Sequence, residues 1–287
     1  MKIVISAEST IDLTSELLKK YNIHTTPFTI TLGDKTALDG EITSKEIIDF
    51  VKKKEILPKT SAVNSFQYEE HFKSLLKEYD AVIHFSLSSE MSSACNNARV
   101  ASEELDNVFV VDTRSLSTGI ALLAIYASKL ITKGLEPQEI YNKVLERIPF
   151  NQTSFVLSRL DYLYKGGRCS GLSYLAATLL KIRPQIVVKE GSMVPKKKYV
   201  GKYDRCITKY VDDVLKEWHT PDLEEVFITY TTADSKDVEK VKQTLKDKGF
   251  KNIHITTAGG TITSHCGENC LGILYLNDGD ENGVYNK

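Results

Sequence analysis

Residues 81–93 read Ala81-Val82-Ile83-His84-Phe85-Ser86-Leu87-Ser88-Ser89-Glu90-Met91-Ser92-Ser93, an apolar run followed by five serines within eight residues. The run 81–85 predicts a buried strand. Small or apolar residues then recur from Ala94 to Leu105, which predicts a helix. A strand that passes directly into a helix is typical of layered α/β proteins.

The serine-rich segment lies where this helix should begin. A helix start carries unpaired backbone N–H groups and a partial positive charge, and serine hydroxyls add further donors. Such a segment suits an anion such as a phosphate or a carboxylate. Because serine is also a preferred helix cap, a capping segment without a ligand is the alternative.

The rest of the first half continues the alternation of strands and helices. Further strands are expected at Lys2–Ser6, Thr25–Leu32 and Val108–Val111. Helices are expected at Thr14–Tyr21, from the capping box at Thr43 to about Lys54, and at Phe66–Tyr79, Leu116–Thr132 and Pro137–Ile148. We therefore predict an α/β domain over residues 1–150, with a mainly parallel sheet flanked by helices.

Three hydroxyl-rich segments follow strands of this sheet, namely Ser6–Thr10, Ser86–Ser93 and Asp112–Ser117. Ligands of open α/β sheets bind beyond the carboxyl ends of the strands. Three such segments at one edge of the sheet predict a polar binding site.

The second half has a different pattern. Strands are expected at 153–157, 226–231, 253–257 and 271–276, and a hairpin at Gln185–Val188 and Met193–Lys197. Helices are expected at 203–218 and 235–248. Residues 171–182 are apolar on most faces and should form an enclosed helix. We predict a second, smaller mixed α/β domain over 151–287, with a ligand between the two domains.

Length and composition limit the class of protein. The chain has 287 residues, which suits about two domains. The charges of 37 Lys and Arg against 38 Asp and Glu give −1, which argues against a nucleic-acid-binding protein. No run reaches the roughly 20 apolar residues of a membrane span. With five scattered cysteines, a cytoplasmic protein with reduced thiols and no stable membrane insertion is expected.

Two short motifs are candidates for anion binding. Lys59-Thr60-Ser61 could donate hydroxyls, or could be a turn or helix cap. Gly166-Gly167-Arg168 joins a flexible backbone to a guanidinium, which suits a carboxylate or phosphate. Its alternative is a helix-ending turn with a surface arginine.

The segment 259–270 places His265 among glycines and hydroxyls. The glycines indicate that the backbone closely approaches another group. A zinc site at His265, Cys266 and Cys270 is disfavoured because no second pair of ligands is present. We therefore expect no metal.

Nucleotide motifs are absent, since the chain has neither a Walker loop nor a dinucleotide fingerprint. No cofactor is expected. Ser92 or Ser93 with His265 and Asp112 supplies the residue types of a hydrolase triad, but no G-x-S-x-G elbow is present. A serine esterase or acyl-transfer enzyme using Ser92 and His265 is the alternative to a binding protein, and a site for a smaller phosphorylated ligand is a third possibility.

Taken together, several separated motifs resemble the DegV family of bacterial fatty-acid-binding proteins. They keep the family's order and span nearly the whole chain. They are Ser9-Thr10-Ile11-Asp12-Leu13, Lys59-Thr60-Ser61, Leu87-Ser88-Ser89 with Ser92, Val111-Asp112 with Ser115 and Gly119, Gly166-Gly167-Arg168-Cys169-Ser170, Leu180-Lys181-Ile182-Arg183-Pro184, and His265 with Gly267 and Gly272.

The resemblance implies a long-chain fatty acid in an apolar tunnel between two α/β domains. Thr60 and Ser92, with their neighbours Ser61 and Ser93, would hold the carboxylate, and Arg168 and His265 would support it; these six are the expected site residues. The resemblance also implies an ATP-binding fatty acid kinase subunit as a possible partner, so that this chain would carry the substrate and not catalyse. The helix at 171–182 would be a wall of the tunnel.

The chain departs from the family pattern at several positions. Glu8 stands where the family usually has aspartate, and Ser93 where it has glycine. Cys266 and Glu268 stand in the final motif. Glu90 and Glu268 would bring negative charge near a carboxylate if they pointed inward.

Overall fold

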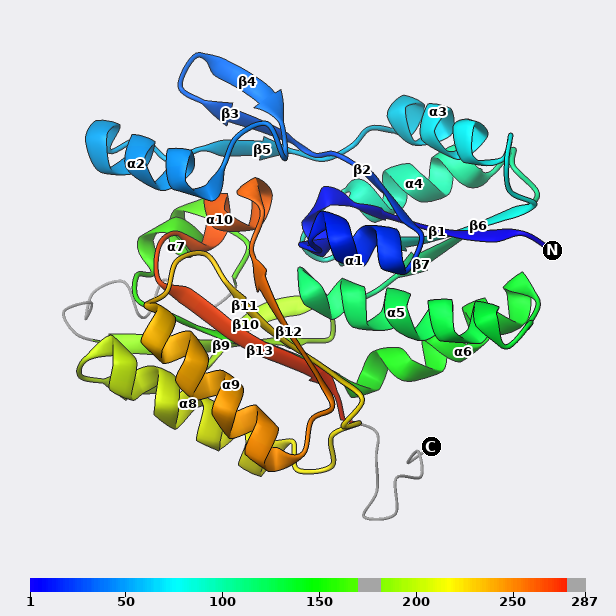
Figure 1. The fold of residues 1–287 in the computed structure, drawn as a ribbon. Coiled ribbons are helices and arrows are strands. Elements are labelled where there is room, and N and C mark those ends of the chain that lie inside the picture. The colour runs from blue at the N-terminus through cyan, green and yellow to red at the C-terminus, as the bar shows by residue number, and fades with distance from the viewer. Residues whose placement is uncertain (170–181, 278–287) are drawn as a thin grey trace.

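Four strands of the first half form a parallel sheet (Figure 1). Their order is β2 (Ile23–Thr26), β1 (Ile3–Glu8), β6 (Ala81–Ser86) and β7 (Val108–Asp112). The structure is a computed structural model and describes residues 1–169 and 182–277. Every residue of β1 and β6 is buried, as expected of central strands in a parallel sheet that is covered on both faces.

Helices cover both faces of this sheet and its edge. Figure 1 shows α3 and α4 on one face and α5 and α6 on the other. These helices are α1 (Ser15–Lys20), α3 (Ser65–Leu75), α4 (Ala94–Ser102), α5 (Thr118–Thr132) and α6 (Pro137–Arg147), with the short 3-10 turns η1 (Ser9–Ile11) and η2 (Ile148–Phe150). The predicted parallel α/β layer is confirmed.

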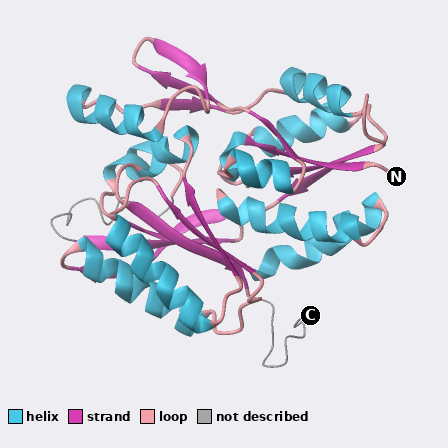
Figure 2. Ribbon diagram, viewed as in Figure 1, coloured by secondary structure: helices cyan, strands magenta, loops and turns pink. Residues whose placement is uncertain are grey.

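The second half forms a six-stranded mixed sheet (Figure 2). Its order is β10 (Ser192–Val200), β9 (Ile182–Lys189), β8 (Asn151–Leu157), β13 (Cys270–Leu276), β11 (Glu225–Tyr230) and β12 (Asn252–Thr257). Only β11 and β12 pair in parallel. One face carries α8 (Tyr203–Glu217) and α9 (Ser235–Lys248). The mixed α/β character predicted for this half is confirmed.

Helix α5 lies between the two sheets and contacts strands of both. This position explains why it is apolar on most faces. Alternate residues of β8 divide between two cores, because Phe155 and Leu157 pack toward α5 and Val156 packs toward α8. One hydrophobic core therefore joins the halves. The chain passes from one sheet to the other near residue 150, and the division into domains 1–150 and 151–287 stays a prediction.

A small third sheet was not foreseen. It has the order β4 (Lys35–Leu38), β3 (Thr29–Leu32) and β5 (Lys59–Ser61), and α2 (Ser44–Lys54) lies between β4 and β5 in the chain. The predicted capping box of Thr43 and Glu46 begins α2. We call β3, β4 and β5 the small sheet.

Three expectations about secondary structure were wrong. The strand expected at Thr25–Leu32 is two strands, broken where Pro27 supplies no N–H. Residues 59–61 are a strand and not a turn. The helix expected to reach Tyr79 ends at Leu75. A helix that was not predicted, α10 (Gly260–Cys266), forms before β13. A further short helix, α7 (Asp161–Gly166), ends at Gly167.

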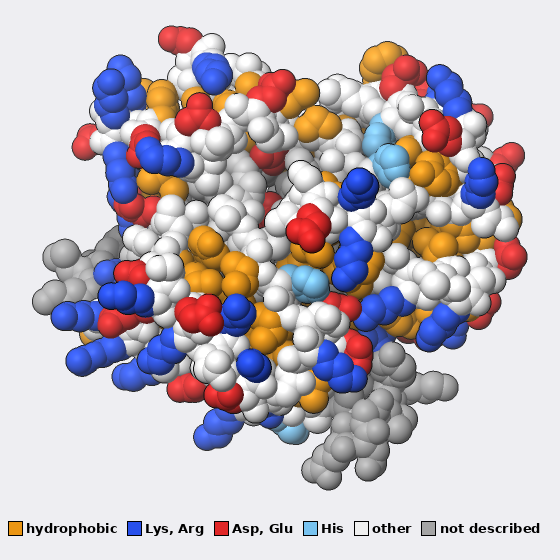
Figure 3. Space-filling view, in the orientation of Figure 1, with side chains coloured by type: hydrophobic (Ala, Val, Ile, Leu, Met, Phe, Trp, Pro, Cys, Tyr) orange, Lys and Arg blue, Asp and Glu red, His pale blue; other side chains and the backbone are white. Residues whose placement is uncertain are grey.

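The enclosed helix expected at 171–182 lies outside the described residues, except for Ile182, which begins β9. No helix in the described part of the chain is long and apolar enough to cross a membrane. Lys, Arg, Asp and Glu side chains are interspersed over the face shown in Figure 3, in keeping with the near-zero net charge.

Candidate functional site

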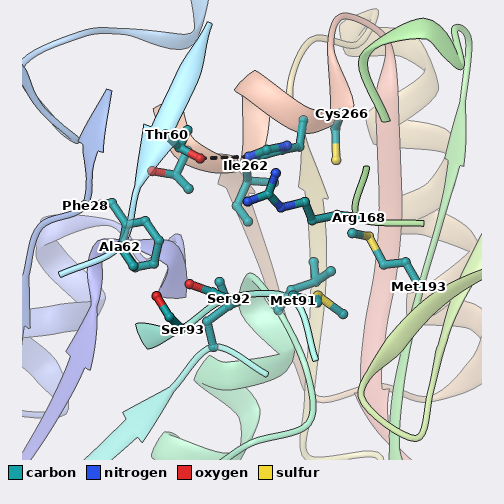
Figure 4. A pocket seen from close by; sticks show the side chains of 14 residues that line it. Phe28, Thr60, Ala62, Met91, Ser92, Ser93, Arg168, Met193, Ile262 and Cys266 are labelled. Atoms are coloured by element: carbon teal, nitrogen blue, oxygen red, sulfur yellow. Dashed lines mark hydrogen bonds between the residues drawn. The ribbon is translucent and has the colours of Figure 1, made fainter. Parts of the chain in front are cut away.

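A cavity of about 240 Å³ opens between the parallel sheet, the small sheet and α10 (Figure 4). It lies beyond the carboxyl end of β6, where the sequence predicted a site. Its wall includes five of the six expected site residues, all except Ser61, together with many apolar side chains. The lining residues are Phe28, Thr60, Ala62, Leu87, Met91, Ser92, Ser93, Leu116, Arg168, Met193, Thr261, Ile262, His265 and Cys266.

The first part of the serine-rich segment binds an anion of the protein itself. The buried Glu8 carboxylate accepts hydrogen bonds from Ser86 Oγ at 2.6 Å, Tyr68 Oη at 2.6 Å and the Leu87 N–H at 2.9 Å. Burial alone raises the pKa of Glu8, but hydrogen bonds from His84, Ser86 and Tyr68 bring this pKa below its usual value. The anion-binding chemistry predicted for Ser86 is thus used internally.

The middle serines also have partners within the chain. Ser89 donates its backbone N–H and its hydroxyl to Asp112, at 3.2 and 2.6 Å. Ser88 donates to the Gly191 carbonyl at 2.7 Å. Ser92 and Ser93 alone among the five serines line the cavity. The half-buried Ser92 accepts one hydrogen bond from the Ala94 N–H at 3.2 Å, and its own proton remains available to a ligand.

The small sheet supplies Thr60. Thr60 pairs with Ile30 of β3, and its side chain lines the cavity. Neighbouring side chains of a strand point to opposite faces, so Ser61 lies exposed and outside the lining. The structure therefore gathers Thr60, but not Ser61, with the other expected residues.

Helix α10 supplies His265. Its Nε2 lies 2.9 Å from Thr60 Oγ1, and either atom can be the donor, depending on the tautomer. Burial, and secondarily the positive charge of Arg168, lowers the pKa of His265 to about 4. The imidazole is therefore neutral at pH 7. Within the described residues its Nδ1 has no hydrogen-bond partner.

Arg168 enters the cavity wall from the turn that ends α7. Gly167 ends this helix with φ of +68°, a conformation that favours glycine, and Arg168 follows. The guanidinium donates to the Gly166 carbonyl at 2.7 Å, and the side chain is exposed. Figure 4 shows Arg168, Ser92 and Thr60 directed toward a common space.

Sequence reasoning missed most of the apolar wall and one hydroxyl. Phe28 follows the Pro27 interruption, and Met91 lies inside the serine-rich segment itself. Thr261 lines the cavity, and its buried Oγ1 has no partner among residues 1–169 and 182–277. A buried hydroxyl without a partner indicates an unfilled hydrogen-bonding position. The hydroxyl-rich 259–264 segment was the available signal for Thr261.

A hydrolase triad is not assembled. His265 bonds to Thr60, and no hydrogen bond joins His265 to Ser92 or Asp112 in the described part of the chain. Asp112 instead receives hydrogen bonds from Ser89 and Arg114. Across the same residues, no group of three or more His, Cys, Asp or Glu side chains is arranged to hold a metal ion.

The two glutamates that would bring negative charge near a carboxylate if they pointed inward have cationic partners elsewhere. Glu90 pairs with Arg114 at 3.1 Å. Glu268 pairs with Lys52 at 2.5 Å and with Arg159 at 3.5 Å. Neither glutamate lines the cavity, so neither opposes an anion there.

The arrangement of the two α/β halves and the hydroxyl-lined cavity agrees with a family match. A family model described as "Uncharacterised protein, DegV family" matches residues 2–278. The chain belongs to the DegV family. The DegV motifs at Thr60, Ser92, Arg168 and His265 are those that meet at the cavity.

Known DegV proteins are similar over nearly their full length. The fatty acid-binding protein of Thermotoga maritima is 31% identical over 283 residues, covering 95% of this chain and 96% of the relative. A solved DegV lipid binding protein of the same organism has a TM-score of 0.82 at 28% identity, covering 96% and 98%. The Streptococcus pneumoniae Fatty Acid Kinase (Fak) B3 protein, loaded with linoleic acid, shares the fold, with a TM-score of 0.83 at 18% identity over 97% and 100%.

Proposed function

We propose that this chain binds a long-chain fatty acid in the cavity, with the carboxylate at Thr60, Ser92 and Arg168. The observation that carries the proposal is the combination, in one cavity, of grouped hydroxyls and a guanidinium with an apolar wall. A DegV relative at 31% identity is a fatty acid-binding protein, which supports the same ligand class.

The polar group suits a carboxylate in number and charge. Ser92, Ser93 and Thr261 offer hydroxyls, and Arg168 is a permanent cation. Neutral His265 would polarise and orient Thr60 and would add no second charge. A buried carboxylate needs such donors, since an unpaired charge away from water is costly.

The apolar wall would supply most of the affinity. Burial of each CH₂ contributes about 0.8 kcal/mol. The cavity of about 240 Å³ adjoins a second, narrow apolar cavity, and Leu116, Ile262 and Cys266 line both. Met91 and Met193 are flexible lining residues that can rotate to admit an acyl chain. We propose that the chain runs past Leu116 toward this second cavity.

Loading of the purified protein tests the proposal. Solvent extraction followed by mass spectrometry should release a long-chain fatty acid, and delipidated protein should take up labelled oleate. Leu116→Trp, which would narrow the path between the two cavities, should reduce uptake of oleate more than uptake of octanoate. A delipidated protein that binds neither would contradict fatty-acid binding.

The finer proposal is presentation of the bound carboxylate to an ATP-binding fatty acid kinase subunit, with this chain as a non-catalytic carrier. Its support is the DegV family resemblance and the exposed position of Ser93 and Arg168 at the cavity wall. Labelled fatty acid, ATP and the kinase subunit of the same genome should yield acyl phosphate only when this chain is present. Ester hydrolysis by this chain alone, lost in Ser92→Ala, would instead favour the esterase alternative.

A further inference from the structure

The start of α10 is held by two aspartate side chains from the first forty residues. Asp39 Oδ1 accepts the Gly260 N–H at 2.9 Å, and Oδ2 accepts the Thr261 N–H at 3.2 Å. Asp12 Oδ1 accepts the Gly259 N–H at 2.8 Å. These three backbone groups have no partner inside a helix, so the oxygens of Asp39 and Asp12 satisfy them.

The glycines of this segment permit the contact. A Cβ added to Gly260 would lie 2.4 Å from Ile30 Cδ1 and 3.2 Å from the Ile42 carbonyl oxygen. A Cβ on Gly259 would lie 3.0 Å from Asp12 Oδ1. The close approach expected from the glycines is therefore an approach to the small sheet and to these aspartates.

Asp39 also contacts the opposite wall of the cavity. It follows β4, and its backbone N–H donates to the Phe28 carbonyl at 2.8 Å. Its carboxylate accepts Ser9 Oγ at 2.9 Å, and Ser9 Oγ in turn accepts the Phe28 N–H at 3.1 Å. One side chain thus joins α10 to the segment that carries Phe28.

The position of α10 depends on such contacts because the helix has only seven residues. A helix of this length is not stable by itself. Thr261, whose N–H Asp39 binds, lies about one helical turn before His265. A shift of the first turn would therefore move the imidazole away from Thr60, which belongs to the small sheet.

We propose that Asp39 is a positioning residue of the fatty-acid site: it fixes α10 against the small sheet and so sets His265 opposite Thr60. The inference rests on the proposed function for its ligand. Asp39 does not line the cavity and acts only through α10 and the Phe28 segment.

The test combines ligand affinity with the state of His265. In delipidated protein, Asp39→Ala should weaken oleate binding about tenfold, the effect of losing a good helix cap at the site. In NMR titrations of the unliganded protein, the pKa of His265 should rise from about 4 toward its ordinary value, because the imidazole becomes more exposed. Asp34→Asn, in the exposed turn of the same sheet, should change neither quantity.

Asp39→Asn keeps the shape of the side chain and one acceptor oxygen, so it should fold and give intermediate changes. It replaces Asp39→Ala if that variant does not fold. Wild-type affinity together with a wild-type His265 titration would overturn the proposal. If the parent protein binds no oleate, the proposed function fails, while the His265 titration still decides whether Asp39 positions α10.

Discussion

Thr60 Oγ1 lies 2.9 Å from His265 Nε2, although the two residues are 205 positions apart in the chain. Thr60 belongs to β5 of the small sheet, and His265 to α10. The contact joins the two elements at the mouth of the cavity, where the carboxylate is proposed to bind. It makes the two side chains one unit.

Removal of either side chain should weaken fatty-acid binding. We expect a loss in affinity of about tenfold or more for Thr60→Val, since a hydrogen bond to a charged group contributes about 1.5–3 kcal/mol. His265→Ala should cause a similar loss, because it removes the group that orients Thr60. The loss in affinity of the double variant should be smaller than the product of the two single losses, because both substitutions remove the same contact. Calorimetric titration of oleate measures this.

Ser61→Ala is the matched control, because Ser61 neighbours Thr60 but lies exposed outside the cavity. Its affinity should equal that of the parent. Fully additive losses in the double variant would show that the Thr60–His265 contact does not orient the ligand.

Stability should fall between pH 6.5 and 4. Burial lowers the pKa of His265 and of His71 from 6.5 to about 4, with a smaller effect of Arg168 on the first and of His84 on the second. In this window the unfolded chain binds protons that the folded chain excludes, so the free energy of unfolding decreases as pH falls. Above pH 6.5 both imidazoles are neutral in the folded and the unfolded state, so they no longer make the free energy of unfolding depend on pH.

Urea unfolding at pH 7, 5.5 and 4.5 measures this decrease. His265→Gln should make it smaller, whereas His219→Gln, at an exposed position, should leave it unchanged. If the free energy of unfolding of His265→Gln decreased with falling pH as much as that of the parent, this would contradict a neutral, enclosed imidazole.

Asp12→Asn should be tolerated at pH 7 and favourable at higher pH. Burial raises the pKa of Asp12 to about 8, against hydrogen bonds from Ser117 and Gly259 that lower it. The folded state therefore loses stability as pH rises from 3.8 through 8, because the unfolded carboxyl ionises more readily. Asparagine can accept from Gly259 and donate to Ser117 without a charge. Melting temperatures should show the variant gaining more on the parent at pH 9 than at pH 6; a variant less stable than the parent at both would contradict this.

Gly166→Ala should reduce binding by displacing His265, since an added Cβ would lie 2.8 Å from Nδ1. Gly167→Ala is the control: its Cβ would meet no described atom within 4 Å, but φ of +68° disfavours alanine by about 1–2 kcal/mol. Gly166→Ala should change the free energy of oleate binding more than the free energy of unfolding. Gly167→Ala should lower the free energy of unfolding alone. Equal affinities in the two variants would show that Gly166 does not support His265.

Local patterns predicted most of the regular structure. The capping box at Thr43 and the helix Ser235–Lys248 were located from sequence, because caps and a 3.6-residue periodicity are local signals. The errors are equally physical. Pro27 interrupts a β-branched run, and residues 59–61 become a strand only because β3 lies beside them.

The α10 segment shows the limit of local signals. Its glycines and hydroxyls are poor helix formers, and the helix exists because Asp12, Asp39 and the small sheet hold its first turn. Sequence placed His265 at the site through a family motif. It contained no local indication that Thr60 is the partner.

The sequence by itself determined the two α/β halves, the edge of the sheet where hydroxyls gather, and the family motifs. Tertiary structure decided which hydroxyls remain for a ligand. Glu8, Asp112 and the Gly191 carbonyl engage Ser86, Ser89 and Ser88, so Ser92 and Ser93 remain at the cavity. The reason is that strand and helix periodicity are properties of neighbouring residues, whereas the use of a hydroxyl depends on whichever group the fold places within 3 Å of it.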